Sequence, residues 1–244
     1  MSWWWAVARQ DDTTFIGLVS GGTEVVCVTE GDGAETPLLH RLPRTPRVVG
    51  VQAHQLLHTA YGGRDGWFAK LGALTAEQVA RLRRTAPPRQ APATLDDVDR
   101  VLLAALSRDG RAPAADLARD AGITESTVRR RVLRLAGAGP LYFDVQLDPA
   151  RLGYRTMALL WLTVAPARLE PVAGELAGHP EVAFAAVTTG HTNLVAVVIC
   201  RTAADLYTYL SRRLPALVGV TQAETVPVLR QVKHVTGAGL RPGR

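Results

Sequence analysis

Hydrophobic and polar residues alternate in the last third of the chain in a way that predicts a small unit of strands and helices. An apolar run rich in strand formers comes first, followed by apolar positions at helical spacing. Two further apolar runs flank a short polar turn and predict a β-hairpin, before a second amphipathic helix and an alternating final strand. This β-α-β-β-α-β order is the ferredoxin-like arrangement. The predicted elements are residues 155–165, 166–178, 181–188, 193–200, 202–214 and 219–234.

The sheet of such a unit has one face without helices. That face needs a cover, because a large exposed apolar patch is unfavourable in a free protein. A second copy of the unit is the simplest cover, so we expect a homodimer or a higher homo-oligomer that associates through these sheets.

Three short helices are predicted immediately upstream of this unit. Thr94 and Asp97 form a capping pattern before a first helix, which ends near Asp109. Pro113 suits the first turn of a second helix, and Gly122 ends it. A tight turn with a glycine before a third helix is typical of a helix-turn-helix.

The third predicted helix lies in ITESTVRRRVLRL, residues 123–135, which has four arginines within six positions. Val128, Val132 and Leu135 form its inward stripe, and at about 100° per residue most of the arginines project away from that stripe. Exposed arginines are more often a solvated surface, but two preceding helices and a capped polar start are what docking in the DNA major groove requires. The residues expected to contact double-stranded DNA are Thr124, Glu125, Ser126, Arg129, Arg130 and Arg134.

The amino-terminal part of the chain repeats part of the carboxy-terminal unit. FIGLVSGGTEVVCV at Phe15–Val28 matches FAAVTTGHTNLVAV at Phe184–Val197. Two strands with a glycine turn, a helical stretch and a further strand are therefore predicted twice. The supporting matches are Gly50-Val51 with Gly219-Val220, at the same offset, and an RLP tripeptide at 41–43 and 213–215.

This first copy is curtailed. About a dozen residues precede Phe15, which is too few for an opening strand and a helix of usual length. Trp3, Trp4 and Trp5 either substitute for that strand or reflect an artefact of gene prediction, and the sequence leaves both explanations open.

Composition and charge add few constraints on function. The formal charge of +6 and the isoelectric point near 9.9 favour an anionic partner only weakly, because net charge says nothing about clustering. Cys27 and Cys200 each lie in an apolar run and are expected to be buried strand thiols, not a disulfide or a metal pair. The start lacks a signal-peptide pattern and no apolar run approaches about 18 residues, so we expect a cytoplasmic protein without a membrane partner.

Residues 95–135 (LDDVDRVLLAALSRDGRAPAADLARDAGITESTVRRRVLRL) resemble the DNA-binding domain of the Lrp/AsnC, or feast/famine, transcription regulators. Residues 140–154 (PLYFDVQLDPARLGY) resemble the hinge strand that follows it, and residues 155–235 resemble the family's RAM effector-binding domain. The resemblance implies dimers formed by facing RAM sheets, often assembled further, with amino acids bound between protomers. Residues 14–61 resemble the later half of another RAM domain, as in longer relatives that carry both domains twice, but a first DNA-binding domain is lacking.

The same resemblance places an effector loop between the two hairpin strands. It maps to Gly190, His191, Thr192 and Asn193, with Thr225 on the last strand nearby. Many relatives carry an acidic residue where Asn193 stands, and an amide is a weaker anchor for an ammonium ion, which puts ordinary amino-acid binding in question. The alternative is that GHTN is only a hairpin turn. The corresponding GGTE loop of the first copy ends in a glutamate, a possible ligand.

The chain is thus expected to be an α+β protein. A winged helix-turn-helix would precede a ferredoxin-like βαββαβ (RAM) domain and follow a truncated RAM-like domain, with a proline-rich linker, TAPPRQAPATLDD, before the helices. The expected boundaries are 1–66 for the partial RAM-like domain, 67–93 for a helical segment and linker, 94–140 for the helix-turn-helix, 141–154 for the hinge strand, 155–236 for the RAM domain and 237–244 for a flexible tail.

The favoured function is a sequence-specific transcriptional regulator, in which arginine–phosphate contacts set affinity and the start of the third helix reads bases. An amino acid or another small molecule at the RAM interface would modulate it, without a cofactor, a metal or a catalytic residue. One alternative is a sirohaem-type tetrapyrrole decarboxylase of the same layout, with His191 and His234 touching substrate carboxylates. Another is a non-DNA-binding partner of full-length regulators. The intact arginine face and the lack of an acid and base pair favour the regulator.

Overall fold

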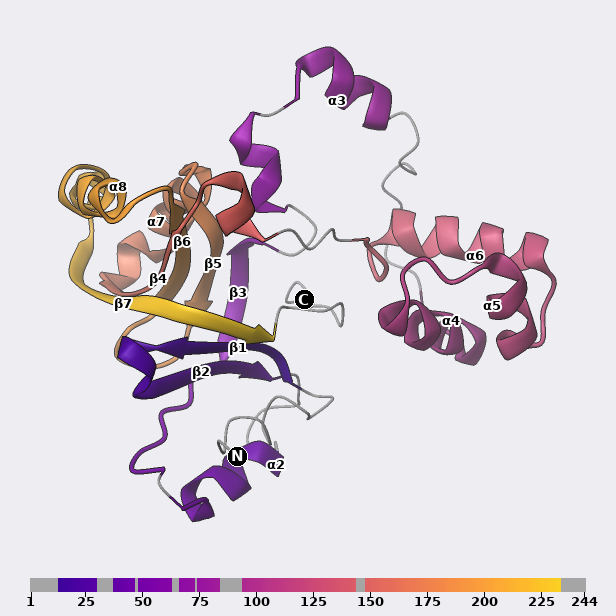
Figure 1. Ribbon diagram of the computed structural model, residues 1–244, viewed down its shortest axis with the longest axis horizontal. Helices are drawn as coiled ribbons and strands as arrows, with labels where there is room; N and C mark the ends of the chain where they lie inside the picture. The colour runs from indigo at the N-terminus through magenta and orange to yellow at the C-terminus, as the bar shows by residue number, and fades with distance from the viewer. Residues whose placement is uncertain are drawn as a thin grey trace. The chain divides into compact units, whose positions relative to one another are not determined.

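The chain folds into two compact units, which the computed structural model shows in Figure 1. The sheet unit joins the described residues up to Leu71 with residues 148–233, and the helical unit holds the described residues between 72 and 143. Within the described part of the chain, no helix is long and apolar enough to cross a membrane. The residues that the structure describes are 13–29, 37–46, 48–62, 66–72, 74–83, 94–143 and 148–233.

The helical unit contains the three predicted helices of a helix-turn-helix. They are α4 (Asp97–Arg108), α5 (Ala114–Ala121) and α6 (Glu125–Ala138), and the unit also includes α3 (Ala76–Arg83). Gly122 ends α5 with a φ of 65°, a left-handed conformation that glycine adopts without strain. The sharp turn between α5 and α6 therefore depends on a residue without a side chain.

The cap of α4 differs from the predicted one. The side chain of Asp96 accepts a hydrogen bond from the backbone nitrogen of Asp99 at 2.8 Å, and Asp99 Oδ2 accepts one from the nitrogen of Asp96 at 3.2 Å. The expected capping pattern of Thr94 with Asp97 is therefore not formed. Asp96 and Asp99 have the same spacing, and the helix begins after Asp96 instead. Asp97 instead forms a surface ion pair with Arg100.

A small apolar core holds the three helices together. Leu102 from α4, Leu117 from α5, and Val128 and Leu135 from α6 are at most 4% exposed. Val132 packs beside them, so the predicted inward stripe of α6 is confirmed. Each buried leucine contributes roughly 1.5–3 kcal/mol, so this core fixes which face of α6 remains outside.

The chain after α6 does not form the predicted hinge strand within the described residues. Residues 141–143 have no regular structure, and Pro149–Leu152 is a 3-10 helix. No strand that could serve as a wing is found in residues 94–143. Residues 144–147 lie outside the described residues, as do the tryptophans near the start and the tail at 237–244. The proline-rich linker TAPPRQAPATLDD lies outside them up to residue 93.

The predicted β-α-β-β-α-β unit is confirmed in the carboxy-terminal part of the sheet unit. Its four strands are antiparallel and lie in the order β7-β4-β6-β5. Counted along the unit, that is the order 4-1-3-2 of a ferredoxin-like sheet. The elements are β4 (Thr156–Val164), α7 (Leu169–Gly178), β5 (Val182–Thr188), β6 (Leu194–Cys200), α8 (Ala203–Thr208), which continues into a π-helical turn (Tyr209–Arg213), and β7 (Val220–Lys233).

The main core lies between this sheet and its two helices. Leu160 and Leu162 of β4 face Val172 and Leu176 of α7, and all four are fully buried. Tyr209 is also buried, and its hydroxyl is 3.0 Å from Nδ1 of His179. This face of the sheet is therefore filled by residues from the unit's own helices.

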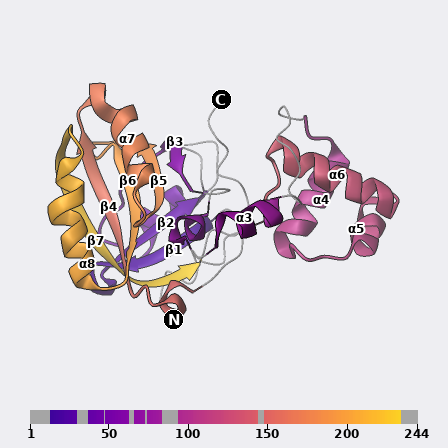
Figure 2. The same cartoon turned by 90° about the horizontal axis from the view of Figure 1, so that it is seen from above.

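The amino-terminal segment does not form a separate domain in the described residues, so the truncated RAM-like domain expected at 1–66 is not confirmed. Its hairpin, β1 (Thr13–Val19) and β2 (Glu24–Thr29), joins one edge of the sheet through β7, and β3 (Leu56–Tyr61) joins the other edge through β5. The result is one seven-stranded sheet in the order β2-β1-β7-β4-β6-β5-β3 (Figure 2). The short helix α2 (Pro37–Arg41) follows β2.

The same segment covers the face of the sheet that carries no helices. Val19 is fully buried and packs with Leu159 of β4 and Val226 of β7. Figure 2 shows α7 and α8 on one side of the sheet and the hairpin β1–β2 on the other. The expected cover by a second copy is therefore replaced, in the described residues, by a cover from the same chain.

Residues just after β3 fasten this segment to α7. The Nζ of Lys70 donates hydrogen bonds to the carbonyl oxygens of Ala177, His179 and Val182 at 2.6, 2.9 and 2.7 Å. These carbonyls lie at and beyond the end of α7, where a helix has acceptors without partners of its own and where a cation is favoured. Trp67 adds a bond from its indole nitrogen to a neighbouring carbonyl at 2.9 Å.

We expect Lys70→Met to destabilise the sheet unit by about 1.5–3 kcal/mol, because three carbonyl oxygens lose a charged donor. Chemical denaturation followed by tryptophan fluorescence would measure this loss. Arg81→Met, which removes an exposed cation from α3, is the control and should change stability by less than about 0.5 kcal/mol. Equal stabilities for the two variants would show that Lys70 is not a fastening point.

Candidate nucleic-acid interface and effector loop

The start of α6 is built to present polar side chains. Thr124 is the N-cap, as predicted, and its Oγ1 accepts a hydrogen bond from the backbone nitrogen of Thr127 at 3.3 Å. The hydroxyl of Ser126 lies 3.0 Å from the same Oγ1, and Ser126 is exposed. The first turn of a helix also carries free backbone N–H groups, which favour an anion at that end.

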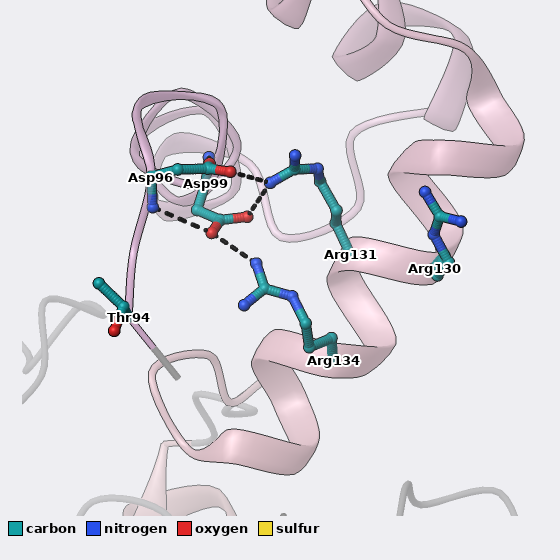
Figure 3. A pocket seen from close by; sticks show the side chains of 6 residues that line it. All are labelled: Thr94, Asp96, Asp99, Arg130, Arg131 and Arg134. Atoms are coloured by element: carbon teal, nitrogen blue, oxygen red, sulfur yellow. Dashed lines mark hydrogen bonds and ion pairs between the residues drawn. The ribbon is translucent and has the colours of Figure 1, made fainter. Parts of the chain in front are cut away.

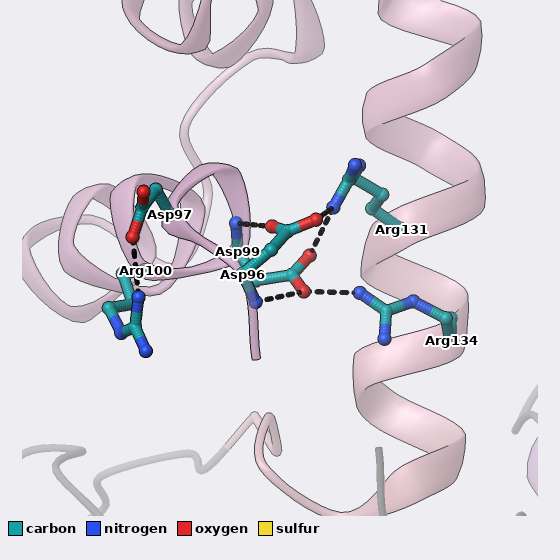
Figure 4. A network of polar contacts seen from close by, with 6 residues as sticks. All are labelled: Asp96, Asp97, Asp99, Arg100, Arg131 and Arg134. Carbon is teal, nitrogen blue, oxygen red and sulfur yellow. Dashed lines mark hydrogen bonds and ion pairs between the residues drawn. The ribbon is translucent and has the colours of Figure 1, made fainter. Parts of the chain in front are cut away.

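Two of the four arginines of α6 are held by aspartates from the start of α4. Arg131 donates to Asp96 at 2.7 Å and to Asp99 at 2.8 Å, and Arg134 donates to the other oxygen of Asp99 at 2.5 Å. Figure 4 shows both guanidinium groups reaching from α6 toward these carboxylates. Arg134, which was predicted to face DNA, is therefore turned toward α4. The prediction used only the position of each residue around α6, which does not include acidic residues on a neighbouring helix.

The carboxylate of Asp99 is buried, with its side chain 1% exposed. Burial acts to raise its pKa, but the hydrogen bonds from Arg134 and Arg131 outweigh that effect and hold the pKa at about 2. A buried charge that lost these partners would be strongly unfavourable. Asp99 therefore has two structural tasks at once, since it closes the capping box of α4 and anchors α6 against it.

The other two arginines remain on the outer surface of α6. Arg129 forms an exposed pair with Glu125 of the same helix at 2.8 Å. Arg130 is exposed and has no ion pair with any residue that the structure describes. Figure 3 draws it at the rim of a hollow of about 270 Å³, with no bond to the aspartates that hold Arg131 and Arg134. An exposed pair contributes only about 0–1 kcal/mol, so Arg129 can exchange Glu125 for a phosphate at little cost.

Sequence reasoning missed Asp96, Asp99 and Arg131 as the residues that set the orientation of α6. A signal was available, since two aspartates three positions apart precede two arginines three positions apart. Residues at that spacing share one face of a helix, so the two pairs can face each other. Only the packing of α4 against α6 decides that they do.

The expected effector loop mainly holds the hairpin of β5 and β6 together. The amide of Asn193 clamps the end of β4, accepting from the nitrogen of Val164 and donating to its carbonyl oxygen, both at 2.8 Å. The carbonyl oxygens of His191 and Thr192 accept hydrogen bonds from threonine hydroxyls at 3.1 and 3.0 Å. The side chain of Asn193 is thus engaged with backbone, as the hairpin-turn interpretation requires.

A shallow hollow of about 410 Å³ lies beside this loop on the sheet unit. Of the five expected effector residues, His191 and Thr192 line it, whereas Gly190, Asn193 and Thr225 do not. Thr225 is half-buried on β7, opposite Leu160 of β4. The lining residues are Trp161, His191, Thr192, Gln222, Ala223 and Glu224.

His54, from the segment before β3, lies against the loop. Its Nδ1 is 2.7 Å from the carbonyl oxygen of Thr189, and its ring centroid is 5.1 Å from that of Trp161. Gly190 has a φ of 105°, and a Cβ there would come within 2.6 Å of the His54 ring. The amino-terminal segment therefore packs against this loop. The sequence alone did not indicate this contact.

Within the described residues, the remaining candidates are not assembled into a second site. Glu24, in the loop of the first copy, accepts a hydrogen bond from the Ser20 hydroxyl at 2.7 Å and is exposed. His191 is exposed, and His234 lies outside the described residues. Cys27 and Cys200 lie on separate strands, β2 and β6, and only Cys200 is buried as predicted, because Cys27 is half-buried.

Two family models match this chain. Residues 95–136 match the AsnC-type helix-turn-helix domain, and residues 157–238 match the Lrp/AsnC ligand binding domain. An uncharacterised HTH-type transcriptional regulator of Pyrococcus horikoshii, PH0140, is 31% identical over 147 residues, which is 60% of this chain and 92% of that protein. The chain belongs to the Lrp/AsnC family. The family's relatives are transcriptional regulators, which gives no support to the decarboxylase alternative.

Other Lrp/AsnC proteins give the same picture. The regulator FL11 of Pyrococcus horikoshii is 29% identical and covers 58% of this chain and 94% of its own length. Among solved structures, AsnC of E. coli matches at 28% identity with a TM-score of 0.50, over 57% of this chain and 94% of that one. LrpA of Mycobacterium tuberculosis matches at 26% identity with a TM-score of 0.51, over 58% and 99%. About two fifths of the present chain thus lies outside each match.

We expect Asp99→Ala to loosen the packing of α6 against α4, at a cost of about 2–3 kcal/mol, because it removes half of the capping box, leaves Arg134 without its carboxylate and leaves Arg131 with Asp96 alone. Hydrogen–deuterium exchange of peptides from α4 and α6 would report the loss locally. Asp97→Ala is the matched control, since that aspartate is two residues away with a side chain 97% exposed. Comparable exchange in both variants would contradict the anchoring role of Asp99.

Proposed function

We propose that this Lrp/AsnC chain is a sequence-specific DNA-binding transcriptional regulator that docks the start of α6 in the major groove. The observation that carries the proposal is the division of the arginines of α6 between two tasks. Arg131 and Arg134 are occupied by the buried Asp99, and Arg131 also by the exposed Asp96, whereas Arg130 is exposed and has no ion pair within the described residues. A fixed helix with a free guanidinium on its outer face is the arrangement that phosphate and guanine contacts need.

The side chains at the start of α6 complement this arginine. Thr124 and Ser126 offer hydroxyl groups, and Glu125 offers a carboxylate that can accept from cytosine once Arg129 has moved to a phosphate. The positive end of the α6 dipole favours the same anionic partner. In this proposal Arg129 and Arg130 set affinity, the residues at 124 to 126 read bases, and Arg134 supports the helix without touching DNA.

We expect Arg130→Ala to weaken binding to duplex DNA by at least about tenfold and to reduce the salt slope by about one, because one phosphate contact is lost. Fluorescence anisotropy with the DNA immediately upstream of the protein's own gene, measured at several salt concentrations, would test this. Arg151→Ala is the control for charge, since it removes an arginine with an 88% exposed side chain outside the helical unit.

The control for folding is Arg131→Ala. It should weaken DNA binding together with faster hydrogen exchange in α6, whereas Arg130→Ala should leave the exchange unchanged. An Arg130→Ala protein that binds DNA with the affinity and salt slope of the parent would contradict the proposed interface. Such a result would favour the alternative of a partner protein that does not bind DNA itself.

We further propose that a free amino acid, or another small molecule with an ammonium group, is the modulator and occupies the hollow beside the effector loop. Glu224 supplies a carboxylate there and Trp161 an aromatic ring, and both attract an ammonium group. This assigns to Glu224 the anchoring task that Asn193 cannot perform while its amide is bound to β4. The regulator NMB0573 of Neisseria meningitidis, which resembles the present fold with a TM-score of 0.53 at 24% identity, was solved as a complex with L-Met.

We expect calorimetry with the common amino acids to detect binding of at least one of them, and Glu224→Gln to weaken it by about tenfold or more. Glu170→Gln, which neutralises an exposed carboxylate on α7, is the control. If no amino acid binds, or if both variants bind alike, Glu224 is not the anchor of an ammonium group.

A further inference from the structure

We infer that residues 13–61 take the place of a second copy of the ferredoxin-like unit, so that one chain by itself contains the sheet pairing that two copies would otherwise form. The inference concerns the sheet unit alone and is independent of DNA binding. It rests on two observations, which are the equivalence of the strand pairings at the two edges of the sheet and the burial of its open face.

The two edges of the sheet are paired in the same way, residue by residue. At one edge β1 pairs with β7, and at the other β5 pairs with β3. Ile16 of β1 lies opposite Lys233 of β7, and Ala185 of β5 lies opposite Tyr61 of β3. Residue numbers in β1 therefore correspond to numbers in β5 that are higher by 169 (185 minus 16). Residue numbers in β7 correspond to numbers in β3 that are lower by 172 (233 minus 61). The pairs at the first edge are Ile16–Lys233, Gly17–Gln231, Leu18–Arg230 and Val19–Val228, and these two shifts convert them into Ala185–Tyr61, Ala186–Thr59, Val187–His58 and Thr188–Leu56.

Even the irregularities of the two pairings coincide. The register shifts between Ile16 and Gly17 and again between Leu18 and Val19. The equivalent shifts occur between Thr59 and Tyr61 and between Leu56 and His58. A β-bulge is a specific feature of a strand pair, so the same two bulges at the same places indicate a pseudo-twofold relation between residues 13–61 and the carboxy-terminal unit.

The sequence repeat supports this pseudo-twofold relation, and the strand pairing corrects one of the matches in the repeat. The offset of 169 between the two hairpins is the one seen in the sequence, and the RLP tripeptides, at 41 and 213, already carry the offset of 172 that the last strand follows. The match of Gly50-Val51 with Gly219-Val220 is not part of the structural register, since residues 48–55 are not in a strand and β3 begins at Leu56.

The face that two such units would share is already buried within one chain. Leu159, Val195 and Ile199 point away from α7 and α8, yet they are only 3%, 6% and 5% exposed. A second copy would find few apolar side chains to cover there, and both strands that it would extend, β7 and β5, are already paired. Two copies of the chain therefore cannot bring two recognition helices together through this face.

Two cysteine pairs would test whether the partners at both edges belong to the same chain. Leu18→Cys with Arg230→Cys spans the first edge, and His58→Cys with Val187→Cys spans its equivalent at the second. Residues opposite each other in an antiparallel pair have Cβ atoms roughly 4.5–5.5 Å apart, close enough for a disulfide after small adjustments. The background carries Cys27→Ala and Cys200→Ala to remove the native thiols.

We expect both pairs to oxidise to disulfides within one chain, and the doubly bonded protein to have the mass of a single chain, 26.2 kDa, in light scattering. Leu18→Cys with Val187→Cys is the control, because β1 and β5 are separated by β7, β4 and β6 in the sheet and these two cysteines should not bond. Disulfides between chains, no disulfide at either edge, or a doubly bonded protein with the mass of two chains would each overturn the inference.

Discussion

The helical unit depends on one buried carboxylate. Asp99 starts α4 through its capping box and binds Arg131 and Arg134 of α6, so a single side chain joins the beginning of one helix to the middle of another. The cost of burying its charge is offset only while both arginines stay in place, which makes the angle of α6 sensitive to this contact. Because these arginines are held inward, the outward face of α6 is left to Arg129, Arg130 and the polar first turn.

The sheet unit has a different requirement. A ferredoxin-like sheet has one open face and two open edges, so the face needs a cover and the edges need partner strands. The chain resolves both needs with residues 13–61, which pair with β7 and β5 and bury the apolar side chains between them. Lys70 then fastens the segment to the end of α7. His54, from the same segment, contacts the effector loop and Trp161. One stretch of chain therefore covers the open face of the sheet and also lies against the loop beside the hollow.

Much of the fold could be predicted from the sequence, and the contacts that were not predicted have physical reasons. The strands and helices of residues 155–233, the three helices before them and the cap at Thr124 follow from local periodicity and capping, and they are confirmed. The ion pair of Arg134 could not be predicted because its partner lies 35 positions away, and the contact of Asn193 could not be predicted because the backbone that it clamps belongs to β4. The repeat was visible, but pairing between strands so distant along the chain leaves no local signal, so the first copy was expected to be a separate domain.

The proposed contact between the outer face of α6 and duplex DNA can be measured by site-directed photo-crosslinking. A photoreactive group would be attached to a cysteine placed at Ser126, on the outer face of α6, or at Ser107, an exposed position on α4, after removal of the native thiols. We expect crosslinks to bases of the upstream duplex from position 126, weakened at high salt, and none from position 107. Crosslinks from position 107 with none from position 126 would contradict it.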